Sequence, residues 1–175
     1  MSILDLYCAV DDFWQEFGPS YHARLVADGQ RHRDRHATMA PSEIMTLLVL
    51  FHQSHYRTFK DFYTQEVAMH LRAEFPTLVS YARFVTWMPA MLVPLCAYLQ
   101  SQMGAGTGIS FIDSTKLIVC QNQRIAQHKV FAANAKRGKS STGWFYGFKL
   151  HLVVSDQGDM LAWCLTPGNV DDRRP

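Results

Sequence analysis

Apolar residues in the first half of the chain recur every three or four positions, which is the spacing of amphipathic helices. This spacing predicts a helix over 5–17, and the Gly18-Pro19 pair predicts its end. The polar, charged stretch 28–38 is predicted to be a loop. A second helix is predicted over 41–53, because a proline in the first turn and a glutamate two residues later favour a helix start.

The next apolar segments also follow the helical period. A Thr-x-x-Asp capping pattern opens a predicted helix over 58–75. Apolar residues then continue at helical spacing over 78–103, where Pro89 and Pro94 predict either two short helices or one kinked helix. The first hundred residues therefore read as an all-helical region.

The period changes from helical to alternating after the glycine-rich run 104–108. A strand is predicted to begin at 108 and to end at Asp113, in an Asp-Ser-Thr turn, followed by a second apolar run over 116–121. The alternation over 144–156 places Phe148, Leu150, Leu152 and Val154 on one strand face. The turn-forming stretch Asp-Gln-Gly-Asp then predicts a hairpin to a strand over 160–168. Residues 108–120 and 144–166 are thus expected to form one sheet.

This order of elements predicts a mixed α/β chain of the α+β kind. Residues 1–103 form the helical N-terminal region, and residues 104–175 form the sheet-containing domain.

Composition places the chain among globular proteins, since 48% of its residues are hydrophobic and 18% are charged. Its longest strongly apolar stretch, 44–51, falls short of the roughly 20 residues that cross a bilayer. The N-terminus has no basic leader region. These features predict a cytoplasmic protein without a membrane partner, whose four cysteines stay reduced.

Basic residues are concentrated in the second half of the chain. Residues 1–100 carry 8 Lys+Arg and 10 Asp+Glu, whereas residues 101–175 carry 9 and 5. Seven of those basic residues lie within 116–149, which contains no acidic residue: Lys116, Arg124, Lys129, Lys136, Arg137, Lys139 and Lys149. Such a run indicates a surface that faces phosphates, and a solvated basic loop is the alternative that charge alone leaves open.

Asp113 is the position with the most chemical information, because it follows the apolar residues of a predicted strand. Phosphoryl-transfer enzymes present such a carboxylate at the edge of a sheet to hold Mg²⁺. One carboxylate does not suffice for such a centre, and an aspartate in a turn is the simpler interpretation of the Asp-Ser-Thr tripeptide by itself.

Three blocks in order, 112–115 (IDST), 137–154 (RGKSSTGWFYGFKLHLVV) and 165–175 (LTPGNVDDRRP), resemble the transposase DDE domain of bacterial insertion sequences. The helical segments 43–63 and 78–92 resemble the N-terminal region of the same transposases. This resemblance makes residues 1–103 a candidate DNA-binding unit of helix-turn-helix type. The resemblance implies the first three strands of an RNase H-like sheet, incomplete in this chain.

The resemblance also implies a function and a site. It makes Asp113 the first catalytic aspartate and a ligand of Mg²⁺ or Mn²⁺ in DNA strand cleavage and strand transfer. It implies transposon-end DNA as the partner, with a homo-oligomer as a further expected assembly. The basic residues expected to contact DNA are Lys116, Lys136, Arg137, Lys139 and Lys149.

The family's second aspartate and its glutamate belong to later elements, so the chain resembles a truncated copy of such a transposase. A truncated copy leaves a second hypothesis: a non-catalytic remnant that binds DNA, or that acts as a partner or inhibitor of a full-length transposase. Asp171 and Asp172 are candidate substitutes for the later carboxylates, and first-turn residues of a following helix are their simpler interpretation.

Overall fold

The computed structural model describes residues 2–29, 38–106 and 108–172. They separate into two compact units, residues 1–101 and residues 102–175. The division lies two residues before the boundary expected from the sequence. Most of the loop predicted over 28–38 lies outside the described residues.

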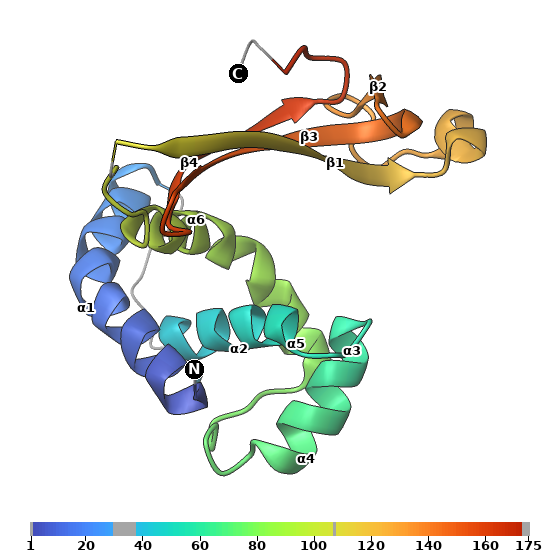
Figure 1. Cartoon of the computed structure of the whole chain (residues 1–175). Helices are drawn as coiled ribbons and strands as arrows, with labels where there is room; N and C mark the ends of the chain where they lie inside the picture. The colour runs from blue at the N-terminus through green and yellow to red at the C-terminus, as the bar shows by residue number, and fades with distance from the viewer. Residues whose placement is uncertain (1, 30–37, 107, 173–175) are drawn as a thin grey trace. The chain divides into compact units, whose positions relative to one another are not determined.

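The first unit is helical (Figure 1). Its elements are α1 (Ile3–Ala27), α2 (Pro41–Gln53), α3 (Phe59–Asp61), a π-helical segment (Phe62–Val67), α4 (Ala68–His70), α5 (Tyr81–Trp87), a 3₁₀ turn (Met88–Met91) and α6 (Leu92–Ser101). The prediction for α2 is confirmed, and the Glu43 carboxylate accepts a hydrogen bond from the Ala40 amide at its start. The largest fully buried side chains of this unit include Phe62, Phe75 and Phe84.

The predicted end of the first helix at Gly18-Pro19 is wrong, because α1 continues to Ala27. The Trp14 indole lies against Gly18, within about 3 Å of where a side chain would begin. Phe17 stacks on Tyr21, one turn later, with ring centroids 5.3 Å apart. Aromatic packing across the Gly-Pro step therefore outweighs the roughly 3 kcal/mol that an internal proline costs a helix.

The later helices follow the sequence with one change. The helix that begins after Thr58 ends at His70 rather than at residue 75. The predicted interruption near Pro89 is confirmed as the 3₁₀ turn between α5 and α6. The continuous run Tyr81–Ser101 is long and apolar enough to cross a membrane by length and composition alone, and in this structure it supplies Phe84 and Met91 to the buried core.

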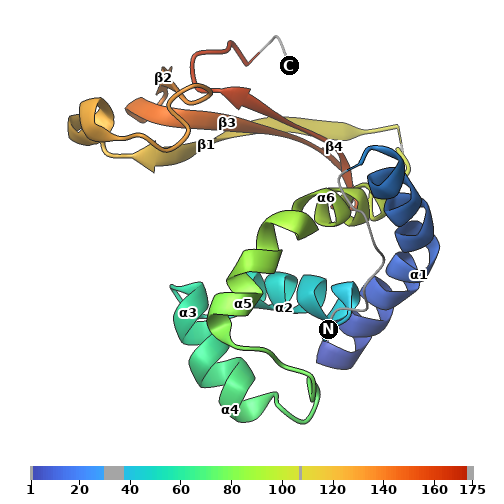
Figure 2. The ribbon, with the colours of Figure 1, turned by 180° about the vertical axis from the view of Figure 1, so that it is seen from behind.

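The second unit is a four-stranded antiparallel sheet, which confirms the mixed α/β class. Its strands are β1 (Ser110–Cys120), β2 (Lys136–Ser140), β3 (Gly143–Ser155) and β4 (Met160–Pro167). The central strand β3 pairs with β1 along one edge, and with β2 and β4 in succession along the other. Figures 1 and 2 show β3 between β1 and β4 from opposite sides.

Two predictions within this sheet are wrong. Asp113 does not end its strand, because β1 continues through Asp-Ser-Thr to Cys120 as one element. The expected number of three strands is also wrong, because the described sheet has four: the basic segment contributes β2, after a 3₁₀ turn over Asn122–Gln127. The predicted hairpin between β3 and β4 is confirmed, with Gly158 at φ 91° in its turn.

Register divides the sheet into two chemically different faces, since directly opposed residues project to the same side. The face here called the Asp113 face holds Asp113, Thr115 and Leu117 of β1, opposite Leu152, Leu150 and Phe148 of β3. The other, the Lys149 face, holds Ser114 and Lys116 opposite His151 and Lys149, with Thr166 of β4 beside them. On the Lys149 face, the polar residues Lys149 and His151 are only 7% and 5% exposed. On the Asp113 face, the apolar residues Leu117 and Phe111 are 43% and 63% exposed.

Candidate functional site

Asp113 is the fourth residue of β1 and lies directly opposite Leu152 of β3. Its side chain is exposed, and its carboxylate accepts a hydrogen bond from the Ser114 amide at 2.7 Å. The remaining lone pairs of the carboxylate are available on the Asp113 face. The strand thus presents Asp113 as an accessible carboxylate, opposite the apolar residues that β3 brings to the same face.

The donors around Asp113 do not complete a metal centre. Of the strand residues that the structure describes, Asp113 alone brings a carboxylate to its face, and Thr115 adds only a hydroxyl. Within 2–29, 38–106 and 108–172, no group of three His, Cys, Asp or Glu side chains could hold a metal ion together. Mg²⁺ and Mn²⁺ prefer several carboxylate or carbonyl oxygens. These residues therefore fit one ligand of such a site and not a whole site.

Asp172 lies on the other side of the sheet from Asp113. Its carboxylate oxygen Oδ1 lies 3.0 Å from the Lys149 ammonium and 3.1 Å from the Ser114 hydroxyl oxygen, both on the Lys149 face. A sheet separates this carboxylate from the one on Asp113, so Asp172 is engaged elsewhere in this structure. Asp171 is exposed and lies in the same segment, 168–172, which follows β4 and is here called the returning segment.

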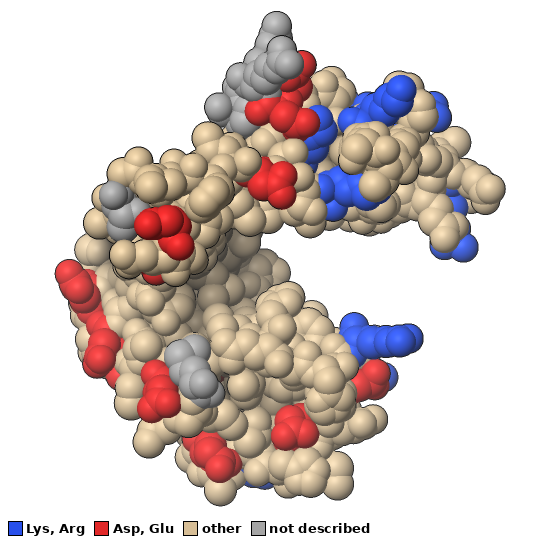
Figure 3. Space-filling model, in the orientation of Figure 1, with Lys and Arg blue, Asp and Glu red and all other residues tan. Residues whose placement is uncertain are grey.

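Two of the predicted DNA-binding residues share a face with Asp113. Arg137 lies opposite Tyr146 and Lys139 lies opposite Trp144, which places both on the Asp113 face. The Arg137 guanidinium lies 5.2 Å from the centroid of the Trp144 ring, a cation–π contact that holds it in an exposed position. Figure 3 shows Lys and Arg side chains gathered over the part of the sheet that includes β2.

The other three predicted DNA-binding residues lie on the opposite face. Lys136 is exposed on β2, opposite Gly147. Lys116 donates a hydrogen bond to the Thr142 hydroxyl. Lys149 is engaged inside the unit, because its ammonium pairs with Asp172 and donates to the Val170 carbonyl at 2.9 Å. The five residues thus form two groups rather than one continuous stripe.

The polar network on the Lys149 face was not identified from the sequence. His151 Nε2 lies 2.9 Å from the Thr166 hydroxyl oxygen, next to the contacts that Lys149 and Ser114 make with Asp172. The sequence signal for this network was Lys149 and His151 at alternate positions of the central strand β3, because a buried charged side chain needs a hydrogen-bonding or oppositely charged partner. Its acidic member could not be identified by alternation, because Asp172 lies outside the strands.

The contact between Asp172 and Lys149 should stabilise the segment that follows β4 against the sheet, and this stabilisation should depend on pH. The hydrogen bond from Lys149 lowers the pKa of the Asp172 carboxyl below its ordinary value of 3.8, against an opposing effect of burial, and the Ser114 hydrogen bond adds to the lowering. The stabilisation is therefore present above pH 3.8 and lost as the pH falls through the lower folded-state pKa. Because Asp172 is 55% exposed, we expect Asp172→Asn to cost only about 1 kcal/mol at neutral pH.

Denaturant unfolding of the two proteins at pH 7 and pH 3 measures this effect. The difference between wild type and Asp172→Asn should shrink at the lower pH. Asp159→Asn, which removes a carboxylate from the β3–β4 turn, is the matched control and should show no such change. An equal difference at both pH values would mean that the ion pair contributes nothing.

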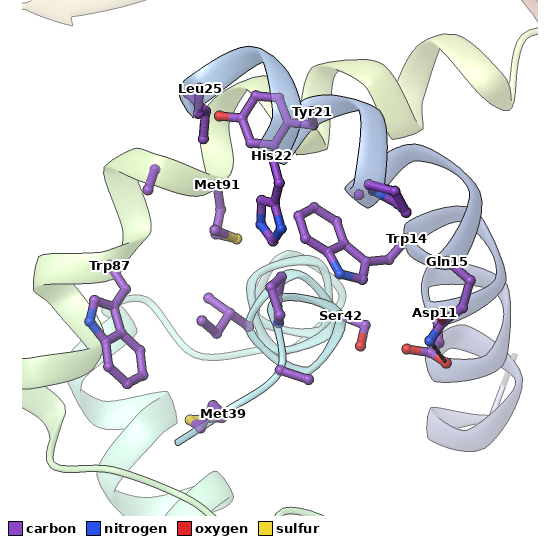
Figure 4. A pocket seen from close by; sticks show the side chains of 16 residues that line it. Asp11, Trp14, Gln15, Tyr21, His22, Leu25, Met39, Ser42, Trp87 and Met91 are labelled. Carbon is purple, nitrogen blue, oxygen red and sulfur yellow. Dashed lines mark hydrogen bonds between the residues drawn. The ribbon is translucent and has the colours of Figure 1, made fainter. Parts of the chain in front are cut away.

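A cavity of about 720 Å³ lies in the helical unit, near the first turn of α2. Figure 4 shows Trp14, His22 and Met91 around that turn, with Asp11 and Gln15 joined at one side. The described residues that line the cavity include an aspartate and no lysine or arginine. Its chemistry therefore differs from that of the basic part of the sheet, and it does not extend the site built on Asp113.

Comparison with known proteins gives a match for the second unit. Residues 103–175 match the family model described as Transposase DDE domain. No curated protein and no solved structure gives a significant match to the chain. The matched segment contains all four strands and every residue of the candidate site.

Proposed function

Because residues 103–175 match the model of the transposase DDE domain family, we propose that this chain comes from the transposase of a bacterial insertion sequence. The proposed reaction is metal-dependent cleavage of DNA strands and their transfer to a target. The proposed partner is transposon-end DNA in the cytoplasm, bound by a homo-oligomer.

The observation that carries the proposal is the shared face of Asp113, Arg137 and Lys139. A carboxylate that holds a metal must face the phosphate to be cut, and cations that bind the same DNA must face the same way. From Leu152, opposite Asp113, to Tyr146, opposite Arg137, there are six residues along β3, or roughly 20 Å at about 3.3 Å per residue. That span is about six base pairs of duplex, so one DNA segment could contact both ends of the face.

We assign Asp113 the role of one metal ligand in this reaction. Magnesium or manganese would polarise the scissile phosphate. The remaining ligands have to come from outside the described residues. The edge of β1 away from β3 pairs with no other strand among the described residues, which leaves a place beside Asp113 for a strand that carries a further carboxylate.

A metal titration tests the role of Asp113 without requiring activity. Millimolar Mn²⁺ should broaden the amide NMR signals of residues next to Asp113, because the ion is paramagnetic and a lone carboxylate holds it weakly. Asp113→Asn should remove the broadening, and Asp159→Asn should leave it unchanged. Broadening that is the same in all three proteins would argue against a metal role for Asp113.

The second candidate function is DNA binding without chemistry, by a remnant that acts as a partner or inhibitor of a full-length transposase. The observation in its favour is that the described strands bring one carboxylate to the Asp113 face. A remnant of this kind should reduce the rate of a full-length transposase when mixed with it. A catalytic subunit should instead raise that rate or leave it unchanged.

A further inference from the structure

Two hydrogen-bond donors on the Lys149 face converge on a single carboxylate oxygen. The Lys149 ammonium lies 3.0 Å from Oδ1 of Asp172, and the Ser114 hydroxyl donates to the same oxygen at 3.1 Å. The donors come from neighbouring strands, β3 and β1, whereas the acceptor comes from the segment that follows β4. The sheet therefore supplies a fixed pair of donors, and the returning segment supplies the anion.

Burial distinguishes the two sides of this contact. The Lys149 side chain is 9% exposed, while the Asp172 side chain is 55% exposed. The returning segment is attached to the sheet by the Gly168 amide, which donates to the Gly147 carbonyl at 2.9 Å. The cation is thus part of the buried sheet, and its anionic partner lies at the surface where another anion can replace it.

Positive charge on this face exceeds what Asp172 balances. Lys116 lies directly opposite Lys149 across the β1–β3 pair, and like charges in opposed positions are destabilising unless an anion lies near them. Lys136 projects to the same face, opposite Gly147. His151 lies directly opposite Ser114 and also adds to the lowering of the Asp172 pKa. The described residues of the Lys149 face therefore carry more lysine charge than carboxylate charge, which favours a ligand that brings more than one negative charge.

We propose that Lys149 and Ser114 form a binding site for a phosphate group, next to His151, and that the Asp172 carboxylate occupies this site as an internal substitute. A phosphate group accepts hydrogen bonds from an ammonium and a hydroxyl as a carboxylate does. Inorganic phosphate carries more charge than a carboxylate, and a DNA backbone brings one charge at each of several successive phosphates. Asp172 then acts as an autoinhibitory side chain, which a phosphate displaces. The site is inferred from these contacts alone, and only the assignment of the phosphate to DNA rests on the proposed function.

Chemical rescue of the full 175-residue chain tests the site. Asp172→Ala removes the carboxylate and leaves a gap beside Lys149, so inorganic phosphate should bind this variant at least fivefold more tightly than wild type. Binding is measured by phosphorus-31 line broadening and by the rise in thermal midpoint, at constant ionic strength with chloride as the reference anion. Asp172→Asn fills the gap with a neutral amide and should gain less, while Asp159→Asn should behave as wild type.

Two results would overturn the proposal. One is phosphate binding to Asp172→Ala that is no tighter than to wild type. The other is a gain that persists when Lys149→Met is added, or, if that double variant fails to fold, when Ser114→Ala is added.

A short DNA duplex added to Asp172→Ala identifies the source of the phosphate. Competition between the duplex and inorganic phosphate supports a DNA backbone phosphate as the ligand. Tight phosphate binding that the duplex does not disturb supports the site and overturns its assignment to DNA.

Discussion

Supercoiled plasmid should remain uncut when this chain is incubated with it alone, in the presence of either Mg²⁺ or Mn²⁺. We expect no divalent-dependent nicking above the level of the Asp113→Ala variant. The assay measures conversion of supercoiled to open-circular DNA over several hours. A transposase with a complete set of carboxylates, run in the same buffer, shows that the conditions support cleavage.

The reason is the balance of charge around Asp113. A two-metal centre brings together two divalent ions about 3.5–4 Å apart. At an effective dielectric constant of about 20, their mutual repulsion is about 16 kcal/mol, four times that of a pair of unit charges. The carboxylate of Asp113 and the substrate phosphate offset only part of this repulsion. The described residues bring no further carboxylate to the Asp113 face, so a stable pair of ions is not expected.

Nicking that requires a divalent ion and disappears in Asp113→Ala would contradict this expectation. Such a result would mean that a second copy of the chain, or a rearranged Asp171 or Asp172, completes the centre. Testing Asp172→Asn in the same assay shows whether Asp172 takes part. If that variant stays active, Asp172 is not a ligand.

Helix α2 was predictable because its signals are local. A proline opens it, the Glu43 carboxylate accepts a hydrogen bond from the Ala40 amide, and apolar residues follow at helical spacing. The continuation of α1 was not predictable in the same way. It depends on aromatic rings that pack across Gly18-Pro19. The expectation that a Gly-Pro pair ends a helix considers only the local sequence and does not include that packing.

The strand β2 shows a different limit of sequence patterns. Its residues, Lys136–Ser140, contain no apolar alternation, because the strand lies at an edge and pairs through its backbone with β3. Gly138 comes so close to Gly168 that an added side chain would overlap the Gly168 carbonyl oxygen. Only the folded sheet brings these two glycines together, so neither periodicity nor charge indicated the strand.

The candidate site was predictable residue by residue but not as an arrangement. Asp113 and the basic run were identified from residue type and order, and the family match includes all of them. The sequence did not indicate that Arg137 and Lys139 share a face with Asp113 while Lys149 lies on the other. This division depends on register, because a shift of one residue exchanges the faces of a strand. It also follows that the basic residues should differ in their contribution to DNA binding.

Neutralising Arg137 and Lys139 together should weaken DNA binding far more than neutralising Lys116 and Lys136. This holds for the chain with Asp172 intact, whose carboxylate occupies the proposed phosphate site on the Lys149 face. Both pairs remove two positive charges from the same unit, so the net charge of the two variants is equal. They differ in face, since the first pair lies on the Asp113 face and the second on the Lys149 face. Glutamine at all four positions removes the charge and keeps a polar side chain, and the second pair is therefore a matched control.

The size of the effect follows from counterion release. Each lost phosphate contact lowers the binding constant by a factor that grows as salt falls, with a slope of about 0.9 in log–log form. Loss of two contacts should reduce affinity about 60-fold at 0.1 M salt and flatten the slope by about 1.8. Fluorescence anisotropy with a labelled duplex, repeated at several salt concentrations, gives both quantities. The loss should be similar for unrelated DNA sequences, because phosphate contacts carry no sequence information.

Trp144 connects this prediction to the structure of the site. Its ring lies under the Arg137 guanidinium, so Trp144→Leu should lower affinity without changing any charge. The salt slope should then stay closer to that of wild type than in the Arg137→Gln, Lys139→Gln protein. Equal losses from the two charge-matched pairs would instead mean that DNA binding follows net charge alone. In that case the Asp113 face would not be the surface that meets DNA, and the basic segment would be a solvated stretch of chain.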